Sequence, residues 1–513
     1  MLCAMRYLFV LLSVLITRTA PAQQGFSRTF DFGELAAGFG SMELAGDTLV
    51  LYGSALEEGW QAFGMLFARF DTSGHLIDYH ICNDSLNDDF TAVYPNSLVK
   101  LSDNSGYVGV GQFFYRKNGY LARFDNSGAL IYLREFPDPA SEVDFYKEVK
   151  ELSDGLLILG DKQNTSNGVL DVFIMKTDFE GNKIWEQKFS TPGRQTLFGS
   201  ALITDANEYV ISASTTAAQG LPLPQIKNTS KIFAIDSLGN AKWQWESQPS
   251  LEELGAGSLF KTPEGYWAYT SARGWYNATY NEISKQPKFI IRDDNFDIIR
   301  DDTFGVADFP INYFTKAIEL NEGGWLAIGL KPVNYPIPPV PMWYNSFSGW
   351  MVRLDSQGEQ LWSRVDTAFW SYETGSVNYL YDAVELPSGS IVACGFSQTY
   401  EPFPKDWGWL IKVSKDGCLD TLFCSPVSTS FPIIPDKAVT LYPNPATSWV
   451  NIQSKSIDKW DRIEVFNVHG QLMQAMRNTT ESRVDISRLD DGMYFIRLTK
   501  AGQYVTKKVI KRR

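Results

Sequence analysis

KIFAIDSLGNAKWQW, at Lys231–Trp245, joins an apolar strand, an Asp-x-x-Gly turn and a second strand that carries two tryptophans. Six further versions of this pattern begin at Leu66, Tyr120, Phe173, Phe289, Trp350 and Trp409. A pattern that recurs along a chain is most simply a structural repeat. We therefore interpret its Asp, Gly and Trp residues as scaffold, and we expect any activity where the copies differ.

A second pattern precedes each copy, so every repeat supplies four short strands. This upstream half is a short apolar strand, a polar turn and a strand that ends near a small residue, as in MELAGDTLVLYGS from Met42. Four-stranded sheets that stack in a ring bury both of their faces. The sequence predicts an all-β chain with a seven-bladed β-propeller over residues 23–425, and we expect Phe26–Phe32 to complete the seventh blade.

The turn of the repeat has a local physical explanation. A glycine stands three residues after the reference position, where a tight hairpin turn requires positive φ. Asn295 takes that place in the fifth copy, because Arg292 is read there as the reference residue. We expect three tryptophans that follow the turns to pack between blades: Trp185, Trp243 and Trp362.

These repeats resemble propeller repeats with a D-x-x-G-x-x-x-W turn that are common in secreted proteins of Bacteroidetes-type bacteria. The resemblance covers roughly residues 26–425 and implies architecture only.

The N-terminus reads as a secretory signal peptide over residues 1–22. Arg6 supplies the positive charge, Tyr7–Ile16 is the apolar segment, and cleavage is expected between Ala22 and Gln23. The apolar segment is too short to span a bilayer, and we expect no transmembrane segment in the mature chain. The mature protein is expected to be exported.

Charge and cysteine usage restrict the function further. The net charge of -13 falls on an acidic body, because Lys and Arg outnumber Asp and Glu by 14 to 7 in residues 437–513. An acidic body repels phosphate backbones, so we expect no nucleic-acid partner.

In an oxidising compartment Cys418 and Cys424 are the candidate disulfide, whereas Cys394 in an apolar run is expected to be buried.

Residues 426–438 are rich in Ser and Pro and read as a linker, and residues 439–513 read as a small Ig-like β-sandwich. This C-terminal stretch resembles the type A sorting domain of cargo of the type IX secretion system. The resemblance implies a partner, the type IX secretion machinery, and a protein secreted or attached to the outer-membrane surface after passage through the periplasm. Its motif residues are Tyr442, Pro443, Asn444, Pro445, Gly470, Gly492, Tyr494, Lys507 and Lys508.

No catalytic motif stands out. The predicted propeller has two histidines, His75 and His80, and neither has an evident catalytic or metal partner in the sequence. Acidic residues are abundant, but no pair is singled out by its position. We predict no catalytic residue, no metal and no cofactor.

Long aromatic loops are the feature most suggestive of function. In a four-stranded meander the loops between the second and third strands share a face with the connections between blades. The long aromatic stretches expected to be loops on this face are Glu57–Gly64, Arg273–Pro287, Lys331–Gly349 and Gln398–Gly408. We expect aromatic side chains on this face to bind a glycan or a protein. The alternatives are a polysaccharide hydrolase or lyase and a structural surface-layer component. The predicted ligand-binding residues are Trp60, Trp275, Tyr276, Trp343, Tyr344 and Trp407.

Overall fold

The structure is a computed structural model of the 513-residue chain. Two compact units divide it, Met1–Val427 and Ser428–Arg513, and each is considered by itself. The residues that it describes contain strands and turns but no helix, which confirms the all-β prediction. The described residues are 25–32, 36–57, 62–84, 88–92, 94–204, 208–217, 227–277, 282–305, 312–332, 347–369, 377–399, 405–419, 439–454, 460–467, 472–479, 482–500 and 503–512.

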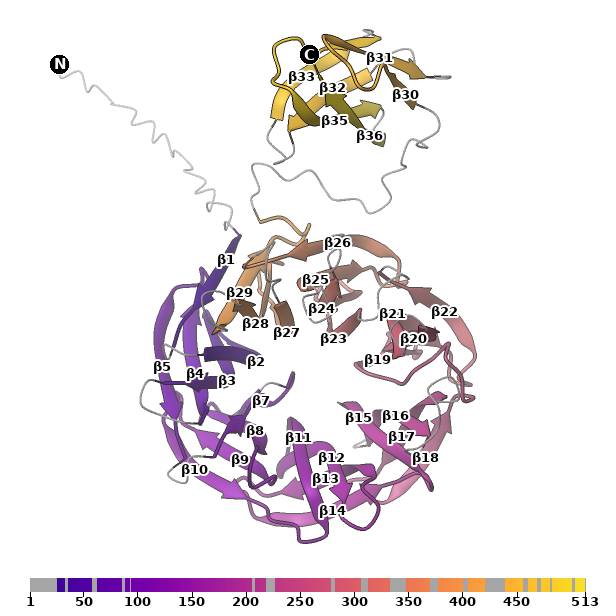
Figure 1. The fold of residues 1–513 in the computed structure, drawn as a ribbon. Coiled ribbons are helices and arrows are strands. Elements are labelled where there is room, and N and C mark those ends of the chain that lie inside the picture. The colour runs from indigo at the N-terminus through magenta and orange to yellow at the C-terminus, as the bar shows by residue number, and fades with distance from the viewer. Residues whose placement is uncertain are drawn as a thin grey trace, which may run out of the picture. The chain divides into compact units, whose positions relative to one another are not determined.

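In the first unit, groups of four antiparallel strands follow one another around a ring (Figure 1). Groups 1 and 2 are β2 (Ala36–Ala45), β3 (Thr48–Leu56), β4 (Gly64–Asp71) and β5 (Leu76–Cys82), then β7 (Leu98–Lys100), β8 (Tyr107–Phe113), β9 (Gly119–Phe124) and β10 (Leu130–Glu135), with the short β6 (Phe90–Thr91) beside β8. Groups 3 and 4 are β11 (Ser141–Leu152), β12 (Gly155–Asn164), β13 (Leu170–Thr177) and β14 (Lys183–Phe189), then β15 (Arg194–Ile203), β16 (Tyr209–Ala217), β17 (Asn228–Ile235) and β18 (Ala241–Glu246).

The remaining strands of this unit continue the ring and close it. Groups 5 and 6 are β19 (Leu259–Lys261), β20 (Trp267–Asn277), β21 (Glu282–Arg292) and β22 (Ile298–Thr303), then β23 (Tyr313–Glu319), β24 (Trp325–Pro332), β25 (Phe347–Leu354) and β26 (Gln360–Asp366). Group 7 is β27 (Val377–Glu385), β28 (Ile391–Thr399), β29 (Lys405–Val413) and the N-terminal β1 (Phe26–Phe30).

The pairing of β1 with β29 confirms that the N-terminal strand completes the last group. The two strands run antiparallel from Phe26 opposite Lys412 to Phe30 opposite Gly408. Arg28 on β1 also donates a hydrogen bond of 2.8 Å to the carbonyl oxygen of Gly74 in group 1. The two ends of the ring are thereby joined.

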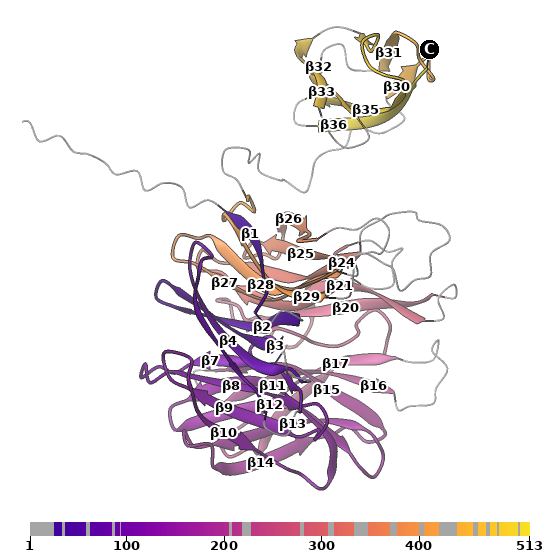
Figure 2. The ribbon, with the colours of Figure 1, turned by 60° about the vertical axis from the view of Figure 1, so that its left-hand side comes forward.

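The core of this unit lies between the groups. Each neighbouring pair of groups shares a cluster of buried apolar residues, including the pair formed by groups 7 and 1. The third strands lie between two neighbours and are apolar on both faces; β13, LDVFIMKT, is buried at seven of its eight positions. The fourth strands, such as β14, are half exposed. Figure 2 shows the ring tilted, with these strands inclined to its axis.

The turns between third and fourth strands are as expected in every copy except the fifth. In the first copy the Gly74 amide donates to the Asp71 carbonyl, and Gly74 has φ 80°. In the fifth copy the amide that donates to the Asp293 carbonyl belongs to Phe296, which has φ 64°. The assignment of Asn295 to the positive-φ position was therefore wrong by one residue.

Two stretches expected to be loops are largely strands. Arg273–Pro287 forms the ends of β20 and β21, which stay paired up to Asn277 opposite Glu282. Gln398–Gly408 includes the end of β28 and the start of β29, which pair up to Thr399 opposite Lys405. Strand pairing extends into both stretches, where the paired backbone groups gain hydrogen-bond partners.

The second unit consists of two antiparallel sheets around one core. The three-stranded sheet is β30 (Val439–Tyr442), β31 (Trp449–Ser454) and β34 (Arg483–Asp485). The four-stranded sheet runs in the order β33 (Leu472–Thr479), β32 (Trp460–Asn467), β35 (Gly492–Lys500) and β36 (Gln503–Lys511). Buried residues of both sheets, such as Val450 and Ile496, belong to the same cluster.

Candidate functional site

A cavity of about 390 Å³ lies where groups 7, 1 and 2 meet. Its lining residues belong to ends of first, second and third strands, at the edge that carries the connections between groups. We call this edge the long-loop face, and the opposite edge the short-turn face. The described residues that line this long-loop cavity are Ala37, Gly38, Ser54, Phe63, Asp89, Phe90, Thr91, Phe114, Tyr381, Phe396 and Asp406.

Stacked aromatic rings form one wall of this cavity. The Phe396 ring lies 5.0 Å from that of Tyr379 and 5.9 Å from that of Tyr381, with interplanar angles of 9° and 20°. Tyr381 and Phe396 line the cavity, whereas Tyr379 continues the stack beside them. Burial raises the pKa of Tyr381 well above its usual value, so its hydroxyl stays protonated at physiological pH. The wall combines flat apolar faces with a hydroxyl donor.

Two carboxylates in the cavity differ in their surroundings. An oxygen of Asp89 accepts a hydrogen bond of 2.6 Å from the Phe63 amide, which fixes the entry to β4. Asp406 Oδ1 is buried and has no hydrogen-bond partner among the described residues. Burial raises the pKa of Asp406, and a hydrogen bond from the Gln398 side chain acts in the opposite direction. A buried acceptor without a partner is costly, and a ligand hydroxyl or amide would satisfy it.

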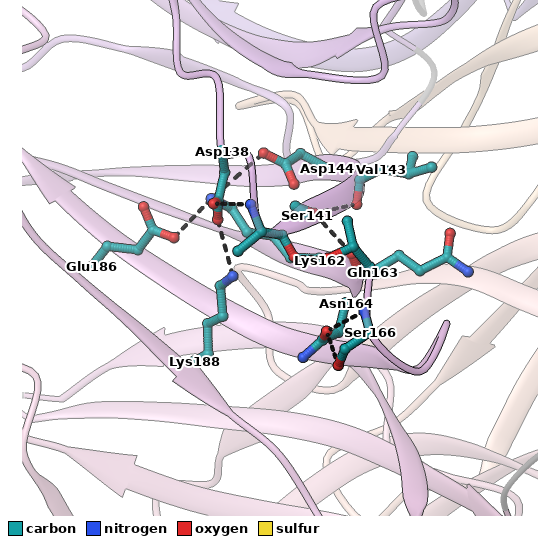
Figure 3. Close-up of polar contacts among 12 residues, drawn as sticks. Asp138, Ser141, Val143, Asp144, Lys162, Gln163, Asn164, Ser166, Glu186 and Lys188 are labelled. Carbon is teal, nitrogen blue, oxygen red and sulfur yellow. Dashed lines mark hydrogen bonds and ion pairs between the residues drawn. The ribbon is translucent and has the colours of Figure 1, made fainter.

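A buried ionic cluster in group 3 was also a candidate (Figure 3). Lys162 Nζ lies 2.7 Å from Glu186, 3.4 Å from Asp138 and 3.5 Å from Asp144. Burial acts to lower the pKa of Lys162, but attraction by Asp144 and Glu186 outweighs it and the pKa is raised. An amine nucleophile needs a lowered pKa. The cluster therefore holds strands together and does not supply a reactive amine.

His75 has partners that the sequence did not reveal, in an exposed turn. Its Nδ1 lies 2.8 Å from Ser73 Oγ and 3.3 Å from Asp71 Oδ2. A catalytic triad needs the serine and the acid on opposite ring nitrogens, whereas here both face the same one. The described part of the chain also holds no group of three or more His, Cys, Asp or Glu side chains that fits a metal ion.

The predicted aromatic binding residues are distributed over separate groups. Trp275 and Tyr276 lie on β20 in group 5, and Trp407 lies on β29 in group 7. The Trp407 ring lies 5.4 Å from the Phe369 ring at an interplanar angle of 52°, and its centre lies 4.4 Å from Lys405 Nζ. None of these three residues lines the long-loop cavity. Three further predicted residues lie outside the described residues: Trp60, Trp343 and Tyr344.

Sequence reasoning missed the cavity residues, although Phe396 carried a signal. Second strands end near small or polar residues in most copies, as at Ser54 and Asp161, whereas Phe396 stands at the corresponding point of IVACGF. A large aromatic residue at that point breaks the repeat. The convergence of Phe114 and Tyr381 on the same cavity depends on the closed ring and has no local signature.

The cysteines agree with the sequence analysis where they are described. Cys418 is disulfide-bonded, whereas Cys82 and Cys394 are free and Cys394 is buried. Cys424 lies outside the described residues, as do Ala22 and Gln23 at the expected cleavage site. The pairing of Cys418 with Cys424 and the cleavage site stay predictions.

The C-terminal motif residues secure the last strand of the second unit. Asn444 Nδ2 donates to the Lys508 carbonyl at 2.8 Å, and Asn444 Oδ1 accepts from the Ile510 amide at 2.9 Å. The peptide bonds that precede Pro443 and Pro445 are cis. Tyr494, two residues after Gly492 on β35, donates to the Asp490 carbonyl at 2.9 Å. Tyr442, Lys507 and Lys508 are at least partly exposed, and Gly470 lies outside the described residues.

Comparisons with known proteins gave one family match and several similar solved structures. None of the curated proteins matches the sequence significantly. Similar solved structures include a candidate 6-phosphogluconolactonase from Bacteroides fragilis, with 10% identity, a TM-score of 0.41, and coverage of 71% of this chain and 95% of that one. The β-propeller domain of the Trilobed protease from Pyrococcus furiosus matches with 9% identity, a TM-score of 0.39, and coverage of 74% and 94%. Puromycin hydrolase matches with 10% identity, a TM-score of 0.43, and coverage of 90% and 59%.

At these identities and TM-scores, the similar solved structures support no inference about the activity of this protein.

In the described residues, no helix is long and apolar enough to cross a membrane. Residues 440–512 match the family described as the secretion system C-terminal sorting domain. The chain thus carries a type IX secretion system C-terminal sorting domain over residues 440–512, which follows a propeller-like body of four-stranded groups.

Proposed function

We propose that this protein is a secreted or surface-attached, non-enzymatic binding protein that takes a glycan or protein ligand on its long-loop face. The strand groups are interpreted as the blades of a seven-bladed β-propeller, and the sorting domain as an Ig-like sandwich. The observation that supports binding is the long-loop cavity, where stacked rings of Tyr381 and Phe396 adjoin the unpartnered oxygen of Asp406. Cavities of this volume with few polar groups suit ligand binding.

The carboxylates favour binding over glycoside hydrolysis. A hydrolase needs two carboxyl groups that both act on the substrate, one as acid and one as base or nucleophile. Asp89 Oδ1 is held by the Phe63 amide and anchors the backbone, whereas Asp406 Oδ1 is buried without a hydrogen-bond partner among the described residues. A carboxyl group with an unpartnered oxygen suits recognition of a donor group on a ligand.

A binding screen with matched variants tests this function. The purified protein is applied to a glycan array and to outer-surface protein extracts, and each detected ligand is retested with Phe396→Ala, Asp406→Asn and Trp407→Ala. Loss of at least tenfold in affinity is expected for the first two variants. Trp275→Ala tests whether the aromatic residues of group 5, outside the cavity, contribute to binding. If Phe396→Ala and Asp406→Asn bind every detected ligand as tightly as the parent protein, the cavity is not the site.

Activity and self-association are measured on the same protein. Release of reducing sugar or unsaturated products from polysaccharides, lost in Asp406→Asn, would establish the hydrolase or lyase alternative. Concentration-dependent assembly of the purified protein into ordered arrays would establish the structural surface-layer alternative. The binding proposal expects neither result.

Export is tested by removing the sorting domain. Deletion of residues 439–513, with the proposed linker 426–438 retained, is expected to leave a folded propeller in the periplasm. The reason is that the proposed partner, the type IX machinery, reads the sorting domain. Cell fractionation with antibody detection distinguishes periplasm from surface and medium. Normal appearance of the truncated protein outside the cell would contradict the proposed route.

A further inference from the structure

A second cavity, of about 540 Å³, lies between groups 4 and 5 at the short-turn face. Its lining includes Glu208, Trp243, Lys261, Trp267, Asp294 and Phe296. Glu208 immediately precedes β16, and Asp294 and Phe296 belong to the turn between β21 and β22. The cavity is therefore at the edge opposite the long-loop cavity, and it is built from short turns of two neighbouring groups.

Phe296 is the exception among the repeated turns. Its φ of 64° is left-handed, whereas the corresponding residue of the other six copies is glycine, as at Gly239 with φ 85°. A side chain in this conformation is strained because its Cβ lies too close to the following carbonyl oxygen. Strained residues of this kind gather at functional sites when the surrounding structure holds them in place. The ring of Phe296 must therefore contribute contacts that a glycine cannot.

Those contacts create a continuous aromatic wall. The Phe296 ring lies 4.7 Å from the Trp245 ring at an interplanar angle of 7°, and 6.2 Å from the Trp267 ring at 2°. The Trp243 ring lies 5.7 Å from that of Trp267. Trp243, Trp267 and Phe296 line the cavity, whereas Trp245 is not among its lining residues. The wall suits a ligand that lays a flat apolar face against it.

At the edge of the wall, acidic and basic side chains form ion pairs. Lys261 Nζ lies 2.7 Å from Asp294 Oδ1 and 3.8 Å from the centre of the Trp267 ring. Glu208 accepts a hydrogen bond of 3.2 Å from Trp243 Nε1 and pairs with Lys242. Each carboxylate thus has an ammonium partner, which favours a neutral ligand. The Asp294 side chain is 73% exposed and remains accessible to hydroxyl groups.

We propose that this cavity binds a neutral hexopyranose unit of a glycan. The C–H groups on one face of such a ring carry partial positive charge and pack against the negative faces of aromatic rings. The hydroxyl groups around the ring edge then reach donors and acceptors at the wall's rim, chiefly Lys261 and Asp294. The site is separate from the long-loop cavity, so its existence does not depend on the proposed function of that cavity.

The substitution Phe296→Gly gives a sharp test, because it restores the glycine found in the other copies. It removes part of the wall and also removes the backbone strain. The full protein and the variant are titrated with neutral oligosaccharides of glucose, galactose and mannose, followed by calorimetry and saturation-transfer NMR. We expect binding of at least one of these sugars to the parent protein and a loss of tenfold or more in Phe296→Gly, with a thermal midpoint that is unchanged or higher.

A matched control separates this site from structural effects. Trp185→Phe alters the equivalent junction between groups 3 and 4, where Trp185 donates to the Ser237 carbonyl at 3.2 Å, and it is expected to leave sugar binding unchanged. The proposal is overturned if none of the neutral sugars binds, if Phe296→Gly binds them as tightly as the parent, or if only anionic sugars bind.

Discussion

Glu43 on β2 has a pKa close to physiological pH. Burial raises this pKa from 4.5 to about 7, Lys316 acts to lower it, and Asp382 adds to the increase. Lys150 of group 3 and Lys100 of group 2 also act to lower it. Because the folded-state pKa lies above the unfolded one, ionised Glu43 opposes folding at high pH, and this cost disappears below pH 4.5.

The substitution Glu43→Gln is therefore expected to stabilise the protein in a pH-dependent way. The gain should be absent at pH 4, grow between pH 4.5 and 7, and level off above pH 7 at up to about 3 kcal/mol. Urea unfolding at pH 4, 6 and 8 measures it. Glu142→Gln, at a residue whose side chain is 49% exposed, is the control and should change little at any pH. A gain for Glu43→Gln that is equal at all three pH values would show that it does not come from ionisation of Glu43.

At the scale of single elements, the buried lysine of β12 holds group 3 together. The Lys162 side chain is 2% exposed and that of Asp144 is 1% exposed. Replacement of one partner of such a pair leaves the other buried without a counter-charge, which costs about 3–5 kcal/mol. Lys162→Met is expected to lower the free energy of unfolding by this amount at pH 7, measured in urea.

The pH dependence of this loss identifies its cause. Burial already raises the pKa of Asp144, so protonation of Asp144 at acidic pH is expected to recover part of the stability lost in Lys162→Met. Lys188→Met removes a more exposed lysine that pairs with Asp138 at 3.0 Å, and it should cost less than about 1 kcal/mol. Equal losses for Lys162→Met and Lys188→Met would show that the burial of Lys162 does not determine the loss of stability.

In the sorting domain, Asn444 closes the edge of β36 with one donated and one accepted hydrogen bond. Asn444→Ala removes both and is expected to destabilise this unit by about 1–2 kcal/mol and to reduce the amount exported. Thermal unfolding of the full protein and cell fractionation measure the two effects. Tyr442→Phe, at a residue that is 48% exposed, is the control. Normal stability of Asn444→Ala would contradict this role.

The sequence predicted the strands and their order better than the exact positions of the turns and the residues that come together in the cavity. Strand order was recoverable because burial on both faces gives third strands a continuous apolar run, as in β13. The fifth turn was misplaced because Arg292 was read as the reference residue, whereas the hydrogen bond from the Phe296 amide to the Asp293 carbonyl shows that Asp293 takes this place. The long-loop cavity was missed because Phe114 and Phe396 are distant in sequence and meet only through ring closure.

The whole first unit depends on the contact between its two chain ends. Every neighbouring pair of groups shares a core cluster, and the cluster between groups 7 and 1 includes Phe26 and Phe30 of β1 packed against it. Without β1, the edge of β29 would lose its antiparallel partner and expose unpaired backbone groups. Closure therefore affects the whole ring, because each group packs against the group on either side of it.

A chain that lacks residues 1–30 is expected to be less stable than one that lacks residues 1–22 by several kcal/mol, since two partly buried phenylalanines and a strand of backbone hydrogen bonds are lost. Calorimetry gives the loss, and size-exclusion chromatography detects association through the exposed edge. A synthetic peptide of residues 25–32, added in excess, should restore much of the stability because it can occupy the place of β1. Arg28→Ala removes the hydrogen bond to Gly74 and the contact with the Phe26 ring but keeps β1, and it should cost about 1–3 kcal/mol. If the chain without residues 1–30 melts at the same temperature as the longer one, β1 does not close the ring.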